Sequence, residues 1–479
     1  MGVLFALLPV ACGKAEESPP HVLLITVDTL RADRLGCYGY DEGVTPNIDD
    51  LADDGVLFEF AHCDVTWTLP SMSSTFTGTY SPRHGVRSYY DVLGEERTTV
   101  AEILKAAGYQ TAAVVGAYPV DSIFGFSQGF DHYDQNFTMA LFHDPTQKVR
   151  HVESKRGKTI TEQMEFAFEK ALNDSWRSDD EVTTTALETL STLQSSEKPF
   201  FLWVHYYGPH AHPDAKVHGK VNNKKHLATY SLKVTNSDYQ VGLLLDALDE
   251  AGVRDRTLVI LHADHGESLG EHGFVGHGAF LYEDNLRVPL IMRWPGRLPA
   301  GARVPGLAGN IDIAPTILEA AGASARNKEM DGESLFRVIR EGGPLREEAY
   351  FETYMPAHFG FTEKFEAPEG GEVEVGVRRR GILRPPWKYI LTSPFPIYED
   401  EVREIEETYT KQAMREQLFN LENDPGEEEN LIEEKAEVAK LLAAQLSKYD
   451  PGAQPSGDRE KIKMPADHLE KLRSLGYVE

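Results

Sequence analysis

The sequence is short of positive charge and of cysteine, and its opening apolar run is too short for a membrane span. Lys and Arg number 48 against 76 Asp and Glu, for a formal net charge of −28. This balance argues against a nucleic-acid-binding protein, because phosphate contacts need clustered Lys and Arg. It also means that a site for an anionic substrate must be locally positive inside a repelling field.

The three cysteines, Cys12, Cys37 and Cys63, are too few and too widely spaced for a zinc ribbon or a disulfide scaffold. Cys37 and Cys63 could pair in an oxidising compartment. We favour two buried thiols.

Residues 1–20 are expected to be a targeting segment and a polar tether. The apolar run Met1–Cys12 cannot span a bilayer and contains the small residues typical of a secretory signal. Its end, Leu8-Pro-Val-Ala-Cys12, is similar to a bacterial lipoprotein signal, in which the cysteine is lipidated. We expect export across the inner membrane of a bacterium, a periplasmic or cell-surface location and a possible lipid anchor at Cys12. An ordinary cleaved signal is the alternative.

A chain of 479 residues favours one large and one smaller domain. Apolar runs predict strands, and helical spacing alternates with them, which predicts an α/β sheet with helices on both faces. The expected strands are 21–28, 111–115, 198–206 and 257–262, and the expected helices are 99–108, 239–251 and 313–321. We place a catalytic α/β domain at 21–330, a C-terminal subdomain at 331–450 and a tail at 451–479.

The C-terminal subdomain has a different texture. Residues 363–376 are rich in Gly and Glu and are expected to form a loop, whereas 377–384 and 387–391 predict strands of a small antiparallel sheet. The acidic runs 399–407 and 422–437 are expected to be solvated faces.

Three separated segments carry the residues for chemistry. Asp28 and Asp264 each follow an expected strand, and sites in α/β sheets lie at the carboxyl ends of strands. Pro70 suits the first turn of a helix, which places Thr68 just ahead of the positive helix end, where an anion is favoured. A threonine hydroxyl is a weak nucleophile and needs a base or a metal. Asp28, Asp264 and His265 offer two carboxylates and an imidazole for one divalent ion, with Thr68 as a fourth ligand.

Four motifs in order resemble the sulfatase family of the alkaline-phosphatase-like superfamily. They are Val27-Asp-Thr-Leu-Arg-Ala-Asp-Arg-Leu-Gly-Cys-Tyr-Gly39, Thr68-Leu-Pro-Ser-Met-Ser-Ser-Thr-Phe-Thr-Gly78, Ala263-Asp-His-Gly-Glu-Ser-Leu-Gly-Glu-His-Gly273 and Leu418-Phe-Asn-Leu-Glu-Asn-Asp-Pro-Gly-Glu427. The resemblance implies an alkaline-phosphatase-like sandwich: a large, mostly parallel central sheet flanked by helices, with a short antiparallel sheet in a C-terminal subdomain. It also implies a hydrolase of sulfuric or phosphoric esters with a zinc, manganese or calcium ion.

The resemblance adds five residues to the site. Pro209-His210 is similar to the family's substrate-contacting histidine, and His277 stands where the family has a lysine near the leaving group, so it could act as general acid. Arg83-His84 resembles a motif that flanks the nucleophile signature, and Arg31 could add positive charge for substrate binding.

The sequence departs from the family pattern at three positions. Thr68 stands where sulfatases carry the cysteine or serine that is oxidised to formylglycine, Met72 replaces an arginine, and Thr29 replaces a second aspartate. Threonine cannot become formylglycine. The remaining Asp, Thr, Asp, His set resembles one of the two metal sites of alkaline phosphatase.

The departures leave three functions open. A threonine ester cannot expel its group by elimination, so it must be hydrolysed by a second attack or passed to another acceptor. The first possibility is a hydrolase of a sulfuric or phosphoric ester, for which a glycan or a lipid could be the carrier. The second is a transferase of the same fold, and the third is an inactive surface or glycan-binding protein.

Overall fold

The computed structural model describes residues 19–87, 91–136, 138–139, 175–210, 223–323, 329–355, 363–366, 372–395 and 415–449. Cys12, the acidic run 399–407 and the tail 451–479 lie outside the described residues, so secretion and lipidation remain predictions of the sequence. Among the described helices, none is long and apolar enough to cross a bilayer.

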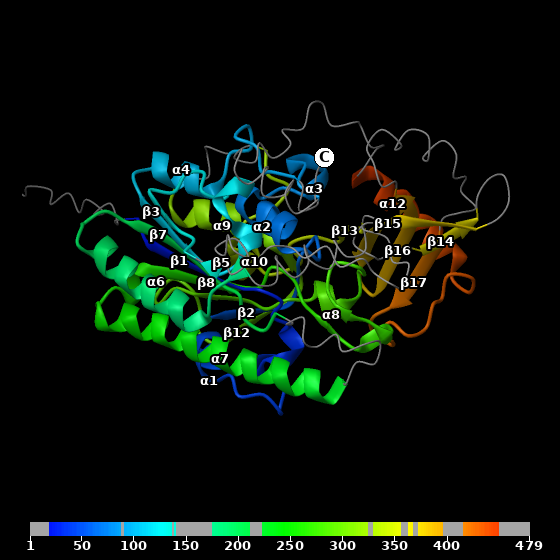
Figure 1. Cartoon of the computed structure of the whole chain (residues 1–479), viewed down its shortest axis with the longest axis horizontal. Helices are drawn as coiled ribbons and strands as arrows, with labels where there is room; N and C mark the ends of the chain where they lie inside the picture. Colours follow the sequence, from blue (N-terminus) through cyan, green and yellow to red (C-terminus); the bar gives the residue numbers. More distant parts are fainter. Residues whose placement is uncertain are drawn as a thin grey trace, which may run out of the picture.

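An eight-stranded sheet forms the centre of the larger part of the molecule (Figure 1). Its strand order is β12-β2-β11-β8-β1-β7-β3-β4, and β11 runs antiparallel to both of its neighbours. The strands are β1 (His21–Val27), β2 (Val56–His62), β3 (Gln110–Val115), β4 (His132–Asp134), β7 (Phe200–Tyr206), β8 (Thr257–His262), β11 (Leu290–Arg293) and β12 (Ala302–Gly309). The central strands β1, β7 and β8 are buried along their whole length, as continuous apolar runs predict. The α/β fold predicted from the sequence is confirmed.

Helices cover both faces of this sheet (Figure 1). One face packs against α1 (Pro46–Asp53), α6 (Asp179–Gln194) and α7 (Asn223–Glu250), and the other against α2 (Thr68–Thr77), α4 (Val100–Ala106) and α9 (Ile313–Ala320). The expected helix 239–251 is the second half of α7, which begins sixteen residues earlier than predicted. Its first half carries mostly polar residues, so it lacks the apolar spacing that marked the second half.

A second, antiparallel sheet lies beside the first and is covered by α12 (Ala436–Tyr449) (Figure 1). Its strands are β13 (Ala349–Met355), β14 (Glu363–Glu366), β15 (Glu372–Arg384), β16 (Trp387–Phe395) and β17 (Arg415–Asn420). The expected loop 363–376 is wrong in part: it contains all of β14 and the start of β15, which pair with each other. Cross-strand pairing here overrides the low strand propensity of Gly and Glu.

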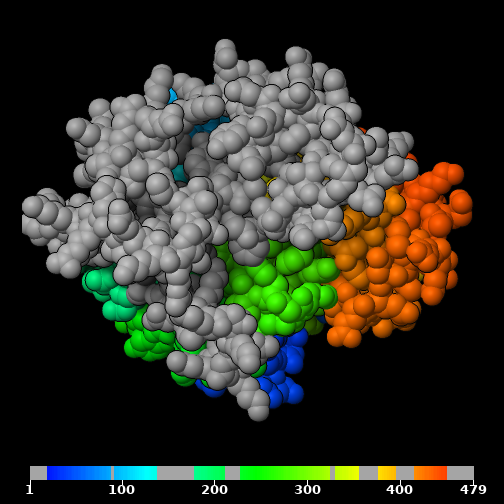
Figure 2. Space-filling view, turned by 45° about the vertical axis from the view of Figure 1, so that its right-hand side comes forward, coloured from blue at the N-terminus to red at the C-terminus, as the bar shows by residue number. Residues whose placement is uncertain are grey.

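The two sheets are joined directly and not by a linker. The backbone N–H of Glu352 in β13 donates at 2.9 Å to the carbonyl of Asp64, which lies four residues before the start of α2 at Thr68. Thr353 Oγ1 donates to the carbonyl of Gly278 at 2.5 Å. Figure 2 shows the orange C-terminal residues packed against the green residues of the larger part.

Candidate active site

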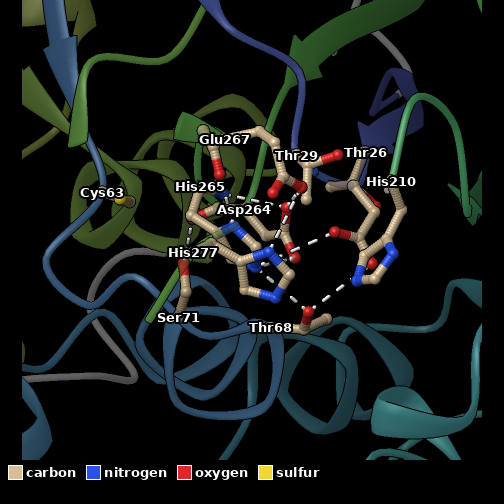
Figure 3. Close-up of polar contacts among 12 residues, drawn as sticks. Thr26, Thr29, Cys63, Thr68, Ser71, His210, Asp264, His265, Glu267 and His277 are labelled. Atoms are coloured by element: carbon tan, nitrogen blue, oxygen red, sulfur yellow. Dashed lines mark hydrogen bonds and ion pairs between the residues drawn. The ribbon is translucent and has the colours of Figure 1, made fainter. Parts of the chain in front are cut away.

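Asp28, Asp264 and His265 meet at the carboxyl edge of the large sheet. Figure 3 shows Asp264 and His265 side by side. Asp28 follows β1, and the other two follow β8, its hydrogen-bonded neighbour. One ligand atom from each residue lies within 4.8 Å of the others, and all three residues are buried. His265 Nε2 is 3.8 Å from Asp28 Oδ1 and 3.4 Å from Asp264 Oδ2.

Backbone contacts orient these three side chains toward a common point. The N–H groups of Thr29 and His265 donate to Asp264 Oδ1 at 3.1 and 2.8 Å, which leaves Oδ2 facing the cluster. His265 Nδ1 lies 2.9 Å from the carbonyl of Gly266. A carbonyl only accepts, so this contact requires the proton on Nδ1 and leaves the lone pair of Nε2 for a ligand. Thr29 holds a left-handed φ of 57°, a conformation rare for a β-branched residue.

The cluster has the properties of a cation site. Asp28 Oδ1 and Asp264 Oδ2 are buried and have no hydrogen-bond partner among the described residues. Burial raises the pKa of Asp28 well above its usual range, and the neighbouring charges of Asp264 and Glu267 raise it further. A divalent cation would supply the missing positive charge, and two carboxylate oxygens with one imidazole nitrogen fit such an ion.

Thr68 faces this cluster from the opposite side. Its Oγ1 lies 3.2 Å from His265 Nε2 and donates to Asp28 Oδ2 at 3.5 Å. Thr68 is the first residue of α2 and not the residue ahead of it, a shift of one position from the prediction. Ser71, one turn along α2, donates to the carbonyl of Asp264 at 2.6 Å and so fixes the helix start against the cluster.

His210 and His277 complete a row of imidazole rings (Figure 3). The His277 ring centroid lies 4.4 Å from that of His265 and 4.9 Å from that of His210. His277 Nδ1 is 3.3 Å from Glu267 Oε2, a carboxylate that can orient the ring. Burial lowers the pKa of His210 well below its usual range, and the charge of His277 lowers it further.

Trp67 links the Thr68 and His277 segments. Its ring meets the edge of His277 at a centroid distance of 5.5 Å. Gly278 lies beneath the same indole, where a β-carbon would come within 2.2 Å of Trp67 Cε2, and its φ is +83°. Only glycine combines this contact with this backbone conformation.

The three residues expected to bind substrate lie in other surroundings. The Arg31 guanidinium pairs with Asp33 at 2.8 Å and with Glu271 at 2.9 Å. Arg83 is half-exposed and pairs with Asp331 at 2.5 Å. Their substrate-binding roles remain predictions, although these carboxylates already occupy both guanidinium groups.

His84 lies behind α2. Its Nε2 is 2.9 Å from Ser74 Oγ, which donates to Asp64 at 2.7 Å, and burial lowers the pKa of His84 to about 3. Met72, at the position of the expected arginine, is fully buried in the apolar core beside α2 and brings no charge. The substrate-binding role predicted for His84 remains a prediction.

The sequence reasoning missed several residues that shape the site. Glu267 lies two residues after His265 in the segment Asp264-His265-Gly266-Glu267. This proximity in the sequence could have identified it as a site residue. Asn310 donates to Asp64 at 2.8 Å and to Ser71 Oγ at 3.1 Å. No local sequence pattern predicts these two contacts. Lys233 on α7 donates to the carbonyl of His210 at 2.5 Å and was missed together with the first half of that helix.

Cys37 and Cys63 are free thiols, as we favoured. Cys63 is buried and Cys37 is partly buried, so only one of the two is fully inside the protein.

In the acidic run 422–437, Glu427 is an exception to the expected solvated face: it is buried and pairs with Lys388 at 2.7 Å.

Comparison with known proteins gives a consistent result. The family model described as Sulfatase matches residues 20–323. Arylsulfatase A of Homo sapiens is 28% identical over 371 residues, which cover 72% of each chain. A solved structure of a protein with its substrate D-glucosamine-2-N,6-O-disulfate has a TM-score of 0.65 at 20% identity and covers 94% of this chain and 100% of its own.

A second solved structure is the phosphonate monoester hydrolase of Agrobacterium radiobacter. It has a TM-score of 0.64 at 20% identity and covers 90% of this chain and 95% of its own. At this identity the two structures support the fold, and the family model supports the membership. The chain belongs to the sulfatase family and is a hydrolase of ester bonds.

Proposed function

We propose that this protein is a metal-dependent hydrolase that cleaves a sulfuric or phosphoric ester by in-line attack of Thr68 Oγ1. The position of this hydroxyl carries the proposal, because it lies 3.2 Å from His265 Nε2 and 3.5 Å from Asp28 Oδ2. Asp28, Asp264 and His265 would hold a zinc, manganese or calcium ion, which would lower the pKa of a bound hydroxyl and neutralise charge on the ester. Ester oxygens would also face the free N–H groups of the first turn of α2.

The neighbouring side chains have roles that follow from their contacts. Asp28 Oδ2, to which the Thr68 hydroxyl donates at 3.5 Å, is the atom within reach that could accept the proton of that hydroxyl. His277, oriented by Glu267, is placed to protonate the oxygen of the leaving alcohol. His210 is neutral because of its low pKa, and the Tyr207 hydroxyl lies 2.8 Å from its Nδ1. If Tyr207 donates to Nδ1, the proton of His210 is on Nε2, where it can be donated to an ester oxygen.

The first step forms a bond from Thr68 Oγ1 to sulfur or phosphorus and releases the alcohol. A threonine ester has no aldehyde to regenerate, so water must attack the same sulfur or phosphorus in a second step and release Thr68. This requirement favours phosphoryl-type groups, which undergo two successive in-line displacements readily. The substrate that we propose is an anionic ester, and the sulfated sugar bound by one structural neighbour supports a glycan as its carrier.

The proposal is tested by comparing the turnover of Thr68→Ala with that of Thr68→Ser, the control variant that keeps a hydroxyl. Nitrophenyl sulfate, phosphate, phosphodiester and phosphonate are assayed with each candidate metal. We expect Thr68→Ala to lose at least about a thousandfold in kcat, because the attacking atom is gone, while Thr68→Ser keeps measurable turnover. Mass spectrometry of acid-quenched enzyme should find the transferred group on the Thr68 peptide.

Two outcomes would contradict the proposal and favour another function. Turnover that depends on an added alcohol acceptor would indicate a transferase. No turnover of any of the four esters with any metal would indicate the inactive, glycan-binding protein.

A further inference from the structure

One face of α7 holds two loops of the active site. The Tyr230 hydroxyl donates to the carbonyl of Thr29 at 2.7 Å, and Ser237 Oγ donates to Asp179 Oδ2 at 2.7 Å. Asp179 Oδ1 in turn accepts the N–H of Gly208 at 3.0 Å. The loops after β1 and β7 therefore both rest on the same helix.

Lys233 lies between these two contacts on the same face. Its Nζ donates to the carbonyl of His210 at 2.5 Å, so one of its three N–H groups is used. No carboxylate of the described residues forms an ion pair with Lys233. Arg31 and Arg83 differ in this respect, because each is paired with at least one carboxylate.

The ammonium of Lys233 is close enough to affect the site. Burial lowers the pKa of Lys233 to about 8, although the charges of Glu267, Asp179 and Asp28 raise it, so the group is mostly charged at neutral pH. A half-buried ammonium without an ion-pair partner is costly, and such groups in active-site regions are candidates for ligand binding.

Among the described residues, Lys233 makes no hydrogen bond or ion pair with Thr68 or with Asp28, Asp264 and His265. Thr68 contacts His265, the His265 ring contacts that of His277, and the His277 ring contacts that of His210. Lys233 joins this row only at the carbonyl of His210. An anion held by Lys233 beside His210 would therefore be a different group from the ester that Thr68 attacks.

We propose that Lys233 binds a second anionic group of the substrate, next to the scissile ester on its leaving-group side. This inference rests on the proposed function and narrows its substrate class to esters that carry a further carboxylate or sulfate. In a chain with a net charge of −28, an unpaired cation beside the site would offset the repulsion that such a substrate meets.

The inference is tested with two matched substrates, a para-nitrophenyl ester and its ortho-carboxy derivative. Both are esters of the acid whose esters the enzyme hydrolyses best. The quantity measured is the ratio of KM for the plain ester to KM for the carboxylated ester. We expect Lys233→Met to lower this ratio about tenfold, because a charge-assisted hydrogen bond to the carboxylate is lost. Lys233→Arg should retain most of the preference.

Lys440→Met is the matched control, because it removes the same charge from an exposed position on α12. It should leave the ratio as in the wild type. An unchanged ratio in Lys233→Met would overturn the inference, even if both KM values rise together, since a parallel rise would mean that Lys233 acts only through His210.

A binding measurement separates this result from failure of the proposed function. Calorimetry compares the affinity of the carboxylated ester for Thr68→Ala and for Thr68→Ala/Lys233→Met, both with added metal. Weaker binding by the double variant would support the role of Lys233 even if the wild type hydrolysed neither ester. Equal affinities would overturn it.

Discussion

Two regions of the molecule bury carboxylates equally deeply and surround them in opposite ways. At the edge of the large sheet, Asp28 and Asp264 each leave one oxygen without a hydrogen-bond partner among the described residues, and burial raises the pKa of Asp28. Between the two sheets, Glu352 is just as buried. It accepts hydrogen bonds from Ser81, Tyr350 at 2.8 Å, Tyr354 at 3.0 Å and Arg378 at 3.1 Å.

The difference appears in the pKa of Glu352. Burial alone would raise it, but the charges of Arg87 and Arg378 outweigh burial and lower it to about 2. A buried carboxylate with complete partners stabilises the fold, whereas one with missing partners indicates a ligand. Burial by itself therefore does not distinguish a structural acid from a functional one.

The largest expected effect separates the two regions by activity. Asp28→Asn should lose at least about a thousandfold in kcat, because the proposed metal ion would lose a charged ligand. The metal-free variant should not be less stable than the metal-free wild type, because the charge removed is one that Asp264 and Glu267 repel. Elemental analysis and urea unfolding measure the two effects. A large loss of stability without metal would place Asp28 with the structural acids.

The next effect is on stability. Glu352→Gln should lower the free energy of unfolding at pH 7 by about 3 to 5 kcal/mol, because it leaves buried guanidinium groups without their counter-charge. The folded pKa is below the usual value of about 4.3, so this stabilisation is present above that value and is lost as pH falls from there toward 2. The difference between wild type and variant should therefore shrink in urea unfolding at pH 3.

Arg384→Gln is the control for this comparison. It breaks an exposed ion pair between Arg384, the last residue of β15, and Glu347, and it should change the free energy of unfolding by less than about 1 kcal/mol. A pH-independent difference between Glu352→Gln and the wild type would contradict the role assigned to its charge.

The smallest effect connects the two regions. Thr353→Val removes the hydrogen bond to the carbonyl of Gly278 and should cost about 1 kcal/mol of stability. Because Gly278 follows His277, we also expect kcat to fall several-fold with little change in KM. Thr353→Ser keeps the hydroxyl and should restore both. A variant with normal kcat would show that the antiparallel sheet does not position His277.

The sequence predicted four neighbouring strands of the large sheet, β8, β1, β7 and β3, because they are buried on both faces, whereas β2, β4, β11 and β12 were not predicted. That burial leaves continuous apolar runs, such as the one from His21 to Val27, which one segment reveals without knowledge of its neighbours. Asp28, Asp264, His265 and Thr68 were found for a related reason: each stands at the end of a strand or the start of a helix. The structure brings these four side chains together.

The remaining parts depend on contacts between distant segments. β14 and the start of β15 are strands because they pair with each other, and their composition alone resembles a loop. Asn310 gains its role from a partner more than two hundred residues away, and Glu352 combines such a partner, Ser81, with neighbours in its own sheet. Lys233 was missed because the polar half of α7 has no apolar spacing to mark it.

The missing side chain at Gly278 has a consequence for how this enzyme could change. The indole of Trp67 occupies the space that any substituent at position 278 would need, so the segments of Thr68 and His277 meet through a contact with bare backbone. In laboratory evolution toward new ester substrates, substitutions at position 278 would not be tolerated. Variation would have to enter from residues that border the substrate elsewhere.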